Sequence, residues 1–429
     1  MSHQVQRYLD QIREEFIGVD DGELADYIPE LARVDPTAFG FSLSSGDGFV
    51  YESGDAAVEF TIQSISKPFT YALALDRCGP DAVDAKIGVE PSGEAFNEIS
   101  VDRSTKRPKN PMINAGAIAA VSLVPASSPE ERFALIQDYY SAFAGRHLEV
   151  DDEVYASEKA TGDRNRAIAY MLASFGVLDD PDDVLDVYFR QCSLKVSATD
   201  LARMAATLAR NGVNPLTGRR VTDAAVVRRT LSVMVTCGMY DAAGDWVSAV
   251  GMPAKSGVGG GILAVLPGQL GIGTYSPLLD AKGNSVRSVL LCRRLSEELG
   301  LHFLTVSRDA RATLRAVYEP HDNIRVYEAH GDLLFCGAEQ VVRTVDRGCE
   351  DFVVGILDVS RADDVDDAAK ALLSGMSTAL HDRGKAGFIV DPDRLVIGEG
   401  SEFESVRYAT VEDAVDAAAT FIRGQLSGG

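Results

Sequence analysis

Histidine is scarce in this sequence, and its scarcity limits the catalytic chemistry open to the chain. Only six of the 429 residues are histidine, and only His3 and His147 precede residue 300. Neither of these two lies in a motif typical of a catalytic histidine. The composition therefore argues against a Ser-His-Asp triad in the first 300 residues, and a serine enzyme here needs another base, such as lysine.

Paired cysteines are also missing, because no Cys-x-x-Cys occurs anywhere in the chain. Such pairs are the usual sequence sign of structural zinc or of a redox motif. The cysteines present are scattered: Cys78, Cys192, Cys237, Cys292, Cys336 and Cys349. We expect reduced, mostly buried thiols and no structural metal.

Long apolar runs and clusters of positive charge are the remaining absences. No run approaches the about 18 residues that a membrane span needs, and the first 16 residues predict a polar amphipathic helix rather than a signal peptide. The chain carries 41 basic and 64 acidic residues, for a formal net charge of −23. Such a chain repels nucleic acid and anionic membranes. We expect a cytoplasmic globular protein with neither as a partner.

The hydrophobic fraction of 46% is enough for a large core, and the length suggests two domains. Residues 23–36 predict a short helix, and 39–55 a hairpin with a Gly-Asp-Gly turn. The stretch 114–235 has mainly the helical period, 246–279 has strand signals that begin at 246–250, and 285–304 is an amphipathic helix. Strands from both ends with helices between them predict an α+β domain over 1–306.

The pattern changes after this domain. Residues 307–322 are polar, so we interpret them as a linker. Residues 323–429 alternate between strand and helix patterns and carry 10 basic and 20 acidic residues. They predict a second, compact, acidic domain with no nucleophile of its own.

The stretch QSISKPFTYALAL, residues 63–75, contains the one Ser-x-x-Lys pair of the chain, Ser64 and Lys67. A lysine three residues along a helix lies on the same face as the serine and can take its proton. Pro68 is tolerated in the first turn of a helix, which predicts a helix start near Ser64. There the serine is close to free backbone N–H groups. One such pair is also expected by chance, so the motif needs support.

A glycine-dense stretch, KSGVGGGILAVLPG at 255–268, gives that support. Its glycines let a ligand approach the main chain, and Lys255 adds a cation beside them. A tight barrel-like bend, a phosphate loop and a dinucleotide turn are alternatives. The two nucleotide readings are weakened because a strand rather than a helix follows the glycines.

Taken together, these motifs resemble the serine β-lactamase and penicillin-binding superfamily, and within it the bacterial-type glutaminases. Seven segments occur in the order of that family: ADYIPEL (25–31), QSISKPFTYALAL (63–75), NPMINAGAI (110–118), SEKATGDRNRAIAYML (157–172), VYFRQCS (187–193), CGMYD (237–241) and PAKSGVGGGI (253–262). The resemblance implies an antiparallel sheet with helical layers in the first domain. It also implies hydrolysis of L-glutamine to glutamate and ammonia, without metal or organic cofactor.

The resemblance assigns roles to individual residues. Ser64 is implied as the nucleophile and Lys67 as its general base, which must be neutral to act. The backbone N–H groups of Ser64 and Val258 would form the oxyanion hole. Tyr27 and Tyr240 match the active-site tyrosines, one of which relays a proton to the leaving ammonia.

The remaining matched positions are implied to bind the substrate: Gln63, Asn114, Glu158, Asn165 and Tyr188. We assign Glu158 to the α-ammonium of glutamine. Without the resemblance, Glu158 reads as a solvated acid at a helix start, Asn165 as a helix cap, and each tyrosine as a packing residue. The family also implies a homo-oligomer, a dimer or tetramer.

Two other functions stay open at this point. A penicillin-interacting hydrolase is disfavoured because there is no Ser-Asp-Asn motif and Ser256 replaces the usual threonine of Lys-Thr-Gly. A regulatory scaffold with a degenerate first domain is disfavoured because a binding relic has no need of the full residue set.

Residues 323–429 resemble a STAS domain, a small sheet with helices to one side, and this implies a regulatory or assembly module of unknown partner. STAS domains often carry a phosphorylated serine in the turn before the central helix. Here that turn has Asp366, Asp367 and Ala368, which argues against a phosphoswitch there, although Ser360 lies nearby. A passive, stabilising appendage is the alternative.

Overall fold

The computed structural model describes residues 4–92, 101–102, 104–304 and 314–427. The chain divides into two compact units. The larger is Asp10–Ser296, and the smaller consists of Met1–Leu9 together with Glu297–Gly429. All the residues that the sequence marks as catalytic or substrate-binding fall in the larger unit.

The larger unit is built on a five-stranded antiparallel sheet in the order β2-β1-β7-β6-β5. Its strands are β1 (Gly40–Ser45), β2 (Val50–Gly54), β5 (Ala254–Ser256), β6 (Gly261–Leu266) and β7 (Leu270–Tyr275). The predicted hairpin is confirmed as β1 and β2, and β1 also pairs with β7. The sheet therefore joins N-terminal and C-terminal segments, as the sequence predicts.

Helix α9 (Ala198–Ala209) packs directly on this sheet. Two glycines of β7 make the close approach feasible. A Cβ on Gly271 would lie 2.2 Å from the backbone nitrogen of Ala206, and one on Gly273 would lie 2.1 Å from the carbonyl oxygen of Ala198. Any larger residue at either position would push the helix away from the sheet.

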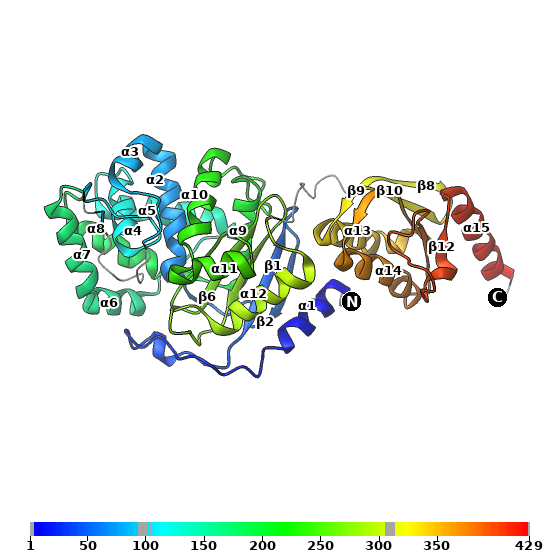
Figure 1. Cartoon of the computed structure of the whole chain (residues 1–429), viewed down its shortest axis with the longest axis horizontal. Coiled ribbons are helices and arrows are strands. Elements are labelled where there is room, and N and C mark those ends of the chain that lie inside the picture. Colours follow the sequence, from blue (N-terminus) through cyan, green and yellow to red (C-terminus); the bar gives the residue numbers. More distant parts are fainter. Residues whose placement is uncertain (1–3, 93–100, 103, 305–313, 428–429) are drawn as a thin grey trace. The chain divides into compact units, whose positions relative to one another are not determined.

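A cluster of helices lies beside the sheet within the same unit (Figure 1). These are α2 (Lys67–Cys78), α3 (Pro80–Lys86), α4 (Asn114–Leu123), α5 (Pro129–Ala144), α6 (Asp152–Thr161), α7 (Asp163–Ser174) and α8 (Pro181–Cys192). The unit also contains α10 (Ala224–Cys237), α11 (Ala243–Ala249), most of α12 (Val286–Leu299) and the short pair β3 (Phe60–Thr61) and β4 (Lys195–Val196). The predicted helical layer over 114–235 is confirmed.

Two local predictions are wrong. Residues 23–36 form only a single 3-10 turn, η1 (Leu31–Arg33), because Pro29 and Pro36 restrict the backbone on either side of it. Residues 246–250, predicted as a strand, belong largely to α11. There the indole of the buried Trp246 donates to the carbonyl of Met252 at 2.7 Å, so tertiary contacts override the strand propensity of the segment.

The smaller unit has a second five-stranded sheet, in the order β12-β11-β10-β9-β8. Strands β9 to β12 are parallel, and β8 is antiparallel to β9. The elements are β8 (Leu314–His321), β9 (Ile324–Leu333), α13 (Phe335–Arg347), β10 (Val354–Val365), α14 (Asp367–His381), β11 (Ala386–Val390), β12 (Arg407–Tyr408) and α15 (Val411–Ser427), with part of α1 (Gln4–Glu14).

The structure corrects the predicted linker 307–322. Residues 314–321 form β8, whose pairing with β9 makes them part of the sheet, and 305–313 lie outside the described residues. The polarity that suggested a linker is that of an edge strand, most of whose side chains are exposed.

The helices of the smaller unit cover both faces of its sheet, not one. Val354 and Ile356 pack in a core cluster with Ala414 and Ala418 of α15. Leu380 of α14 lies instead against the position of Gly355, between those two residues. Because successive residues of a strand point to opposite faces, α14 and α15 cover opposite sides.

All six cysteines are free thiols, five of them buried and Cys78 partly buried, as predicted. None of the helices in the described part of the chain combines the length and apolar character of a membrane span.

Candidate active site

Ser64 lies in a 3-10 turn, η2 (Gln63–Ser66), that leads directly into α2 at Lys67. The prediction of a helix start near Ser64, with Pro68 in its first turn, is confirmed. Both members of the pair are buried, with Ser64 8% and Lys67 0% exposed. The Lys67 Nζ atom lies 3.0 Å from Ser64 Oγ, which is the distance a base needs to take the serine proton.

The electrostatic state of Lys67 follows from its burial. Removing the ammonium from water lowers the pKa of Lys67 to about 8, which brings the neutral amine within reach at physiological pH. Nearby Glu158 and Cys192 act in the opposite direction. A lysine on the surface would stay fully charged and could not act as a base.

A pair of asparagines extends from Lys67. The Nζ atom donates to Asn114 Oδ1 at 2.6 Å, and Asn114 Nδ2 donates to Asn165 Oδ1 at 2.9 Å. Asn114 begins α4 and Asn165 lies in the first turn of α7, so three helices meet at this point. The chain of hydrogen bonds fixes the direction of the Lys67 amine.

A second group of hydrogen bonds surrounds Glu158, which is 6% exposed on α6. The hydroxyl of Tyr27 donates to Glu158 Oε1 at 2.9 Å and lies 3.1 Å from Gln63 Oε1. Burial raises the pKa of Glu158, against the opposing effects of the Tyr27 hydroxyl and the Lys67 charge. A buried carboxylate of this kind is suited to pair with a ligand cation.

Gln63 has a backbone conformation that is uncommon for its residue type. Its φ of 49° is in the left-handed region, where a side chain is disfavoured by of order 1 kcal/mol or more. Tyr240 has the same property, with a φ of 55°. Strained non-glycine residues cluster at functional sites. Gln63 directly precedes Ser64, and the Tyr240 hydroxyl interacts with the Ser64 side chain.

Tyr240 and Lys255 contact each other and share one hydrogen-bond acceptor. The Tyr240 hydroxyl donates to the carbonyl of Ser256 at 3.2 Å, and Lys255 Nζ donates to the same carbonyl at 2.7 Å while lying 3.9 Å from the centre of the Tyr240 ring. Burial raises the pKa of Tyr240 to about 12, so its hydroxyl keeps its proton. Burial and the charge of Lys67 lower the pKa of the fully buried Lys255 well below its ordinary value.

Tyr188 and Cys192 lie on α8, at the side of the site formed by that helix. Tyr188 is buried, and burial followed by the neighbouring Cys192 and Glu158 raises its pKa well above the ordinary value. Cys192 Sγ lies 4.0 Å from Ser66 Oγ, and burial raises its pKa to about 12. The sequence predicts only a reduced, buried thiol at Cys192 and misses its position next to the nucleophile turn. A Cys four residues after Tyr188 on a helix is the available signal.

Val258 lies in the glycine-rich turn that packs against the segment before Ser64. A Cβ on Gly259 would lie 2.8 Å from the Thr61 carbonyl oxygen, and Gly260 has a φ of 95° that favours glycine. The turn therefore comes close to η2 through backbone contact. It is this approach that the glycine density of 255–268 makes feasible.

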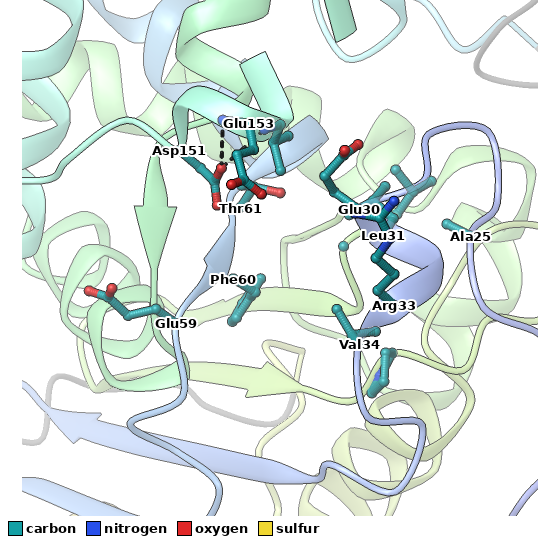
Figure 2. Close-up of a pocket in the computed structure, with 14 residues that line it drawn as sticks. Ala25, Glu30, Leu31, Arg33, Val34, Glu59, Phe60, Thr61, Asp151 and Glu153 are labelled. Atoms are coloured by element: carbon teal, nitrogen blue, oxygen red, sulfur yellow. Dashed lines mark hydrogen bonds between the residues drawn. The ribbon is translucent and has the colours of Figure 1, made fainter. Parts of the chain in front are cut away.

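A pocket of about 270 Å³ opens beside this turn, with Val258, Gly259 and Thr61 in its wall. Figure 2 shows Thr61, Asp151 and Glu153 on one side and Glu30 and Arg33 on the facing segment. Thr61 Oγ1 accepts from Gln63 Nε2 at 3.2 Å, which connects this wall to the nucleophile turn. The lining is rich in carboxylates, with Glu59 as a further member.

The structure thus brings the ten residues marked by the sequence into one region of the larger unit. Among the described residues, no group of three or more His, Cys, Asp and Glu side chains is arranged to hold a metal ion. The arrangement can perform nucleophilic chemistry at a carbonyl, with Ser64 attacking and Lys67 moving its proton.

Comparison with known families decides the membership of the chain. A family model described as Glutaminase matches residues 22–304. The chain belongs to the glutaminase family. The match covers the whole of the candidate site, including all ten residues above.

Individual relatives in this glutaminase family differ in length. Glutaminase 2 of Bradyrhizobium diazoefficiens is 49% identical over 397 residues, 88% of this chain, but the chain spans only 64% of that relative. A glutaminase of Microcystis aeruginosa is 51% identical over 305 residues, 71% of this chain and 90% of its own. Among solved structures, the crystal structure of Mglu aligns with a TM-score of 0.70 at 44% identity, covering 92% of this chain and 100% of Mglu.

Proposed function

We propose that this glutaminase-family protein is a glutamine amidohydrolase, which converts L-glutamine and water to L-glutamate and ammonia. The observation that carries the proposal is the buried Ser64–Lys67 pair, with Nζ 3.0 Å from Oγ and the lysine pKa lowered to about 8. A neutral amine at this distance makes the serine a nucleophile without any histidine.

The first half of the reaction forms an acyl-enzyme. Neutral Lys67 takes the Ser64 proton as Oγ attacks the side-chain amide carbon, and the oxyanion is received by the backbone N–H groups of Ser64 and Val258. The C–N bond then breaks, and the nitrogen leaves as ammonia after gaining a proton that passes from Lys67 with the help of the Tyr240 hydroxyl or that of Tyr27. The γ-glutamyl group remains as an ester of Ser64.

The second half hydrolyses the ester. Lys67, neutral again, takes a proton from water, whose oxygen attacks the ester carbon. The bond to Ser64 Oγ breaks and the serine regains a proton, which releases glutamate and restores the enzyme.

The substrate's free amino-acid end accounts for the second group of side chains. Glu158 offers a buried carboxylate for the α-ammonium, and the Tyr27 hydroxyl orients it. Gln63, Asn114, Asn165 and Tyr188 are the further contacts we propose, with their amide and hydroxyl groups as donors for the α-carboxylate. A relative, Mglu, has been crystallised in a glutamate form, which supports an amino-acid ligand for this site.

The direct test is to incubate the purified protein with L-glutamine and measure ammonia and glutamate. We expect the two in equal amounts, and a γ-glutamyl adduct on the peptide that contains Ser64 after rapid acid quenching. Turnover of a chromogenic cephalosporin with none of glutamine would support the penicillin-interacting alternative and overturn the proposal.

Replacing Glu158 by glutamine tests the assigned contact with the substrate ammonium. The change keeps the shape of the side chain and removes its charge, so we expect KM for glutamine to rise about 10–100-fold, with kcat much less affected. Steady-state kinetics at one pH measure both constants.

The control for this variant is Asp152→Asn, on the same helix but exposed and outside the pocket lining. We expect its KM to stay within about twofold of wild type, because screened surface charges contribute little. A KM for Glu158→Gln as low as that of the control would contradict the assignment.

We further propose that the domains are a catalytic domain up to about residue 306 and a C-terminal STAS-like domain with a regulatory or assembly role in a homo-oligomer. The β9-α13-β10-α14-β11 order of the smaller unit supports an independent α/β fold. The match to the relative from Microcystis aeruginosa, which covers 71% of this chain and 90% of that relative, supports a catalytic part that is shorter than the whole chain.

A chain that ends at residue 304 tests this role. It retains α12 and with it Glu298, which accepts a hydrogen bond from the Tyr8 hydroxyl. We expect kcat and KM for glutamine within about threefold of the full chain, and a smaller oligomer by light scattering. Unaltered oligomeric size together with unaltered kinetics would overturn the regulatory or assembly proposal and leave a passive appendage.

A further inference from the structure

A network of buried polar side chains is hydrogen-bonded to the turn that carries the proposed nucleophile. The proposed reaction does not use these side chains. The members of the network are Ser66, Thr70, Tyr140 and Gln191, and each is 0% exposed. They come from η2, α2, α5 and α8. Burying a polar group costs folding free energy unless the group is hydrogen-bonded. Each of these four side chains is hydrogen-bonded.

The contacts converge on Ser66. Its main-chain carbonyl accepts from the Tyr140 hydroxyl at 2.7 Å, and its side-chain Oγ donates to the carbonyl of Gln63 at 2.6 Å. The Thr70 hydroxyl lies 2.5 Å from the Tyr140 hydroxyl and 2.8 Å from Gln191 Oε1. Gln191 Nε2 completes the circuit by donating to Ser66 Oγ at 3.4 Å.

The same network fixes the strained residue of the turn. Gln63 has a φ of 49°, and a left-handed conformation of a non-glycine residue persists only where surrounding contacts determine it. The hydrogen bond from Ser66 Oγ to the Gln63 carbonyl is such a contact. Ser64, between Gln63 and Ser66, has its backbone N–H and its Oγ directed by the geometry of these two neighbours.

We propose that Thr70, Tyr140 and Gln191, acting through Ser66, are positioning residues that hold the Gln63–Ser66 turn so that Ser64 Oγ and its N–H face the substrate carbonyl. This inference rests on the proposed function. The helices α5 and α8 supply the frame, and the turn is aligned to it by hydrogen bonds rather than by packing alone. Misplacement of a reacting atom by about 1 Å reduces a rate by about 100-fold.

The test compares Thr70→Val with a matched control, Thr207→Val. Thr207 is also 0% exposed on a helix, and its hydroxyl donates to the carbonyls of Phe143 and Arg203 away from the turn. For Thr70→Val we expect kcat for glutamine to fall about 10–100-fold, with KM within threefold of wild type. For Thr207→Val we expect both constants unchanged, with a similar decrease in melting temperature.

Two further variants separate positioning from general stability. Thr70→Ser keeps the hydroxyl, so we expect its kcat to lie within about threefold of wild type. If Thr70 had only a structural role, kcat of each variant would instead fall in proportion to its loss of melting temperature. Tyr140→Phe removes the donor to Ser66 and should lower kcat as Thr70→Val does. It also provides the readout if Thr70→Val does not fold.

The outcomes distinguish this inference from the proposed function. If Thr70→Val and Tyr140→Phe fold and keep kcat within twofold of wild type while Ser64→Ala is inactive, the positioning role is overturned and the function stands. If wild type does not hydrolyse glutamine, the proposed function fails, and the positioning role with it.

Discussion

Ser64→Ala is expected to lower kcat for glutamine by about 10⁴-fold or more. The substitution removes the Oγ atom that Lys67 Nζ contacts at 3.0 Å, and with it the atom that would carry the γ-glutamyl group. The Lys67 amine also contacts Asn114 Oδ1, an amide oxygen that cannot replace the serine as nucleophile. Ammonia release by the variant and by wild type at equal concentration measures the effect.

The variant should still bind its substrate, because Ser64 contributes little to the contacts proposed for the amino-acid end. We expect the dissociation constant of glutamine, measured by calorimetry, to change less than about tenfold. The control is Ser296→Ala, another buried serine, whose Oγ donates to the carbonyl of Val250 at 2.7 Å, far along the chain from the turn. Turnover by Ser64→Ala within tenfold of this control would exclude the acyl-enzyme mechanism.

Lys67→Met is the second change with a large expected effect. Methionine fills a similar volume in the buried position but offers no base, so we expect kcat to fall about 10³–10⁴-fold. The Ser64→Ala/Lys67→Met double variant should be little worse than either single variant, because residues that act as a unit are not additive. A double variant whose loss is the product of the two single losses would contradict a joint role.

The pH dependence of wild type gives an independent check on Lys67. The reactive form is the neutral amine, and burial lowers the pKa of Lys67 to about 8. Thus kcat/KM should rise about tenfold per pH unit below pH 8 and level off above it, since the free enzyme must lose a proton to act. Lys67→Arg stays charged throughout this range and should show no such rise. A flat wild-type profile between pH 6 and 8 would contradict the assignment.

The hairpin and the helical layer were predictable because each has a clear local period. Alternation and a Gly-Asp-Gly turn are enough to specify β1 and β2, and β7 then pairs with β1. The failure at 23–36 has a local cause, because Pro29 and Pro36 restrict the backbone there. At 246–250 the burial of Trp246 overrides the strand propensity of the segment. Trp246 and its neighbours favour a strand by residue type, yet Trp246 lies in α11, where its buried indole donates to the carbonyl of Met252.

The edge strand β8 shows the same limit in the smaller unit. Its residues look like a polar linker because most of their side chains are exposed, and only pairing with β9 makes them a strand. Hydrogen bonds between strands leave no local pattern when neither face of a strand is fully buried.

The sequence by itself determined the chemical pair of this protein. A serine and a lysine three residues apart, with Pro68 after them, share one face wherever the segment has helical turns. The scarcity of histidine and the glycines of 255–268 point the same way.

Only the tertiary structure decided the surroundings of this pair. The lowered pKa of Lys67 comes from burial, the direction of its amine from Asn114, and the hydrogen bonds to Ser66 of the nucleophile turn from Tyr140 and Gln191 on other helices. Local spacing fixes which side chains share a face of a helix. Burial and hydrogen bonding depend on segments far apart in the chain, which come together only when the core forms.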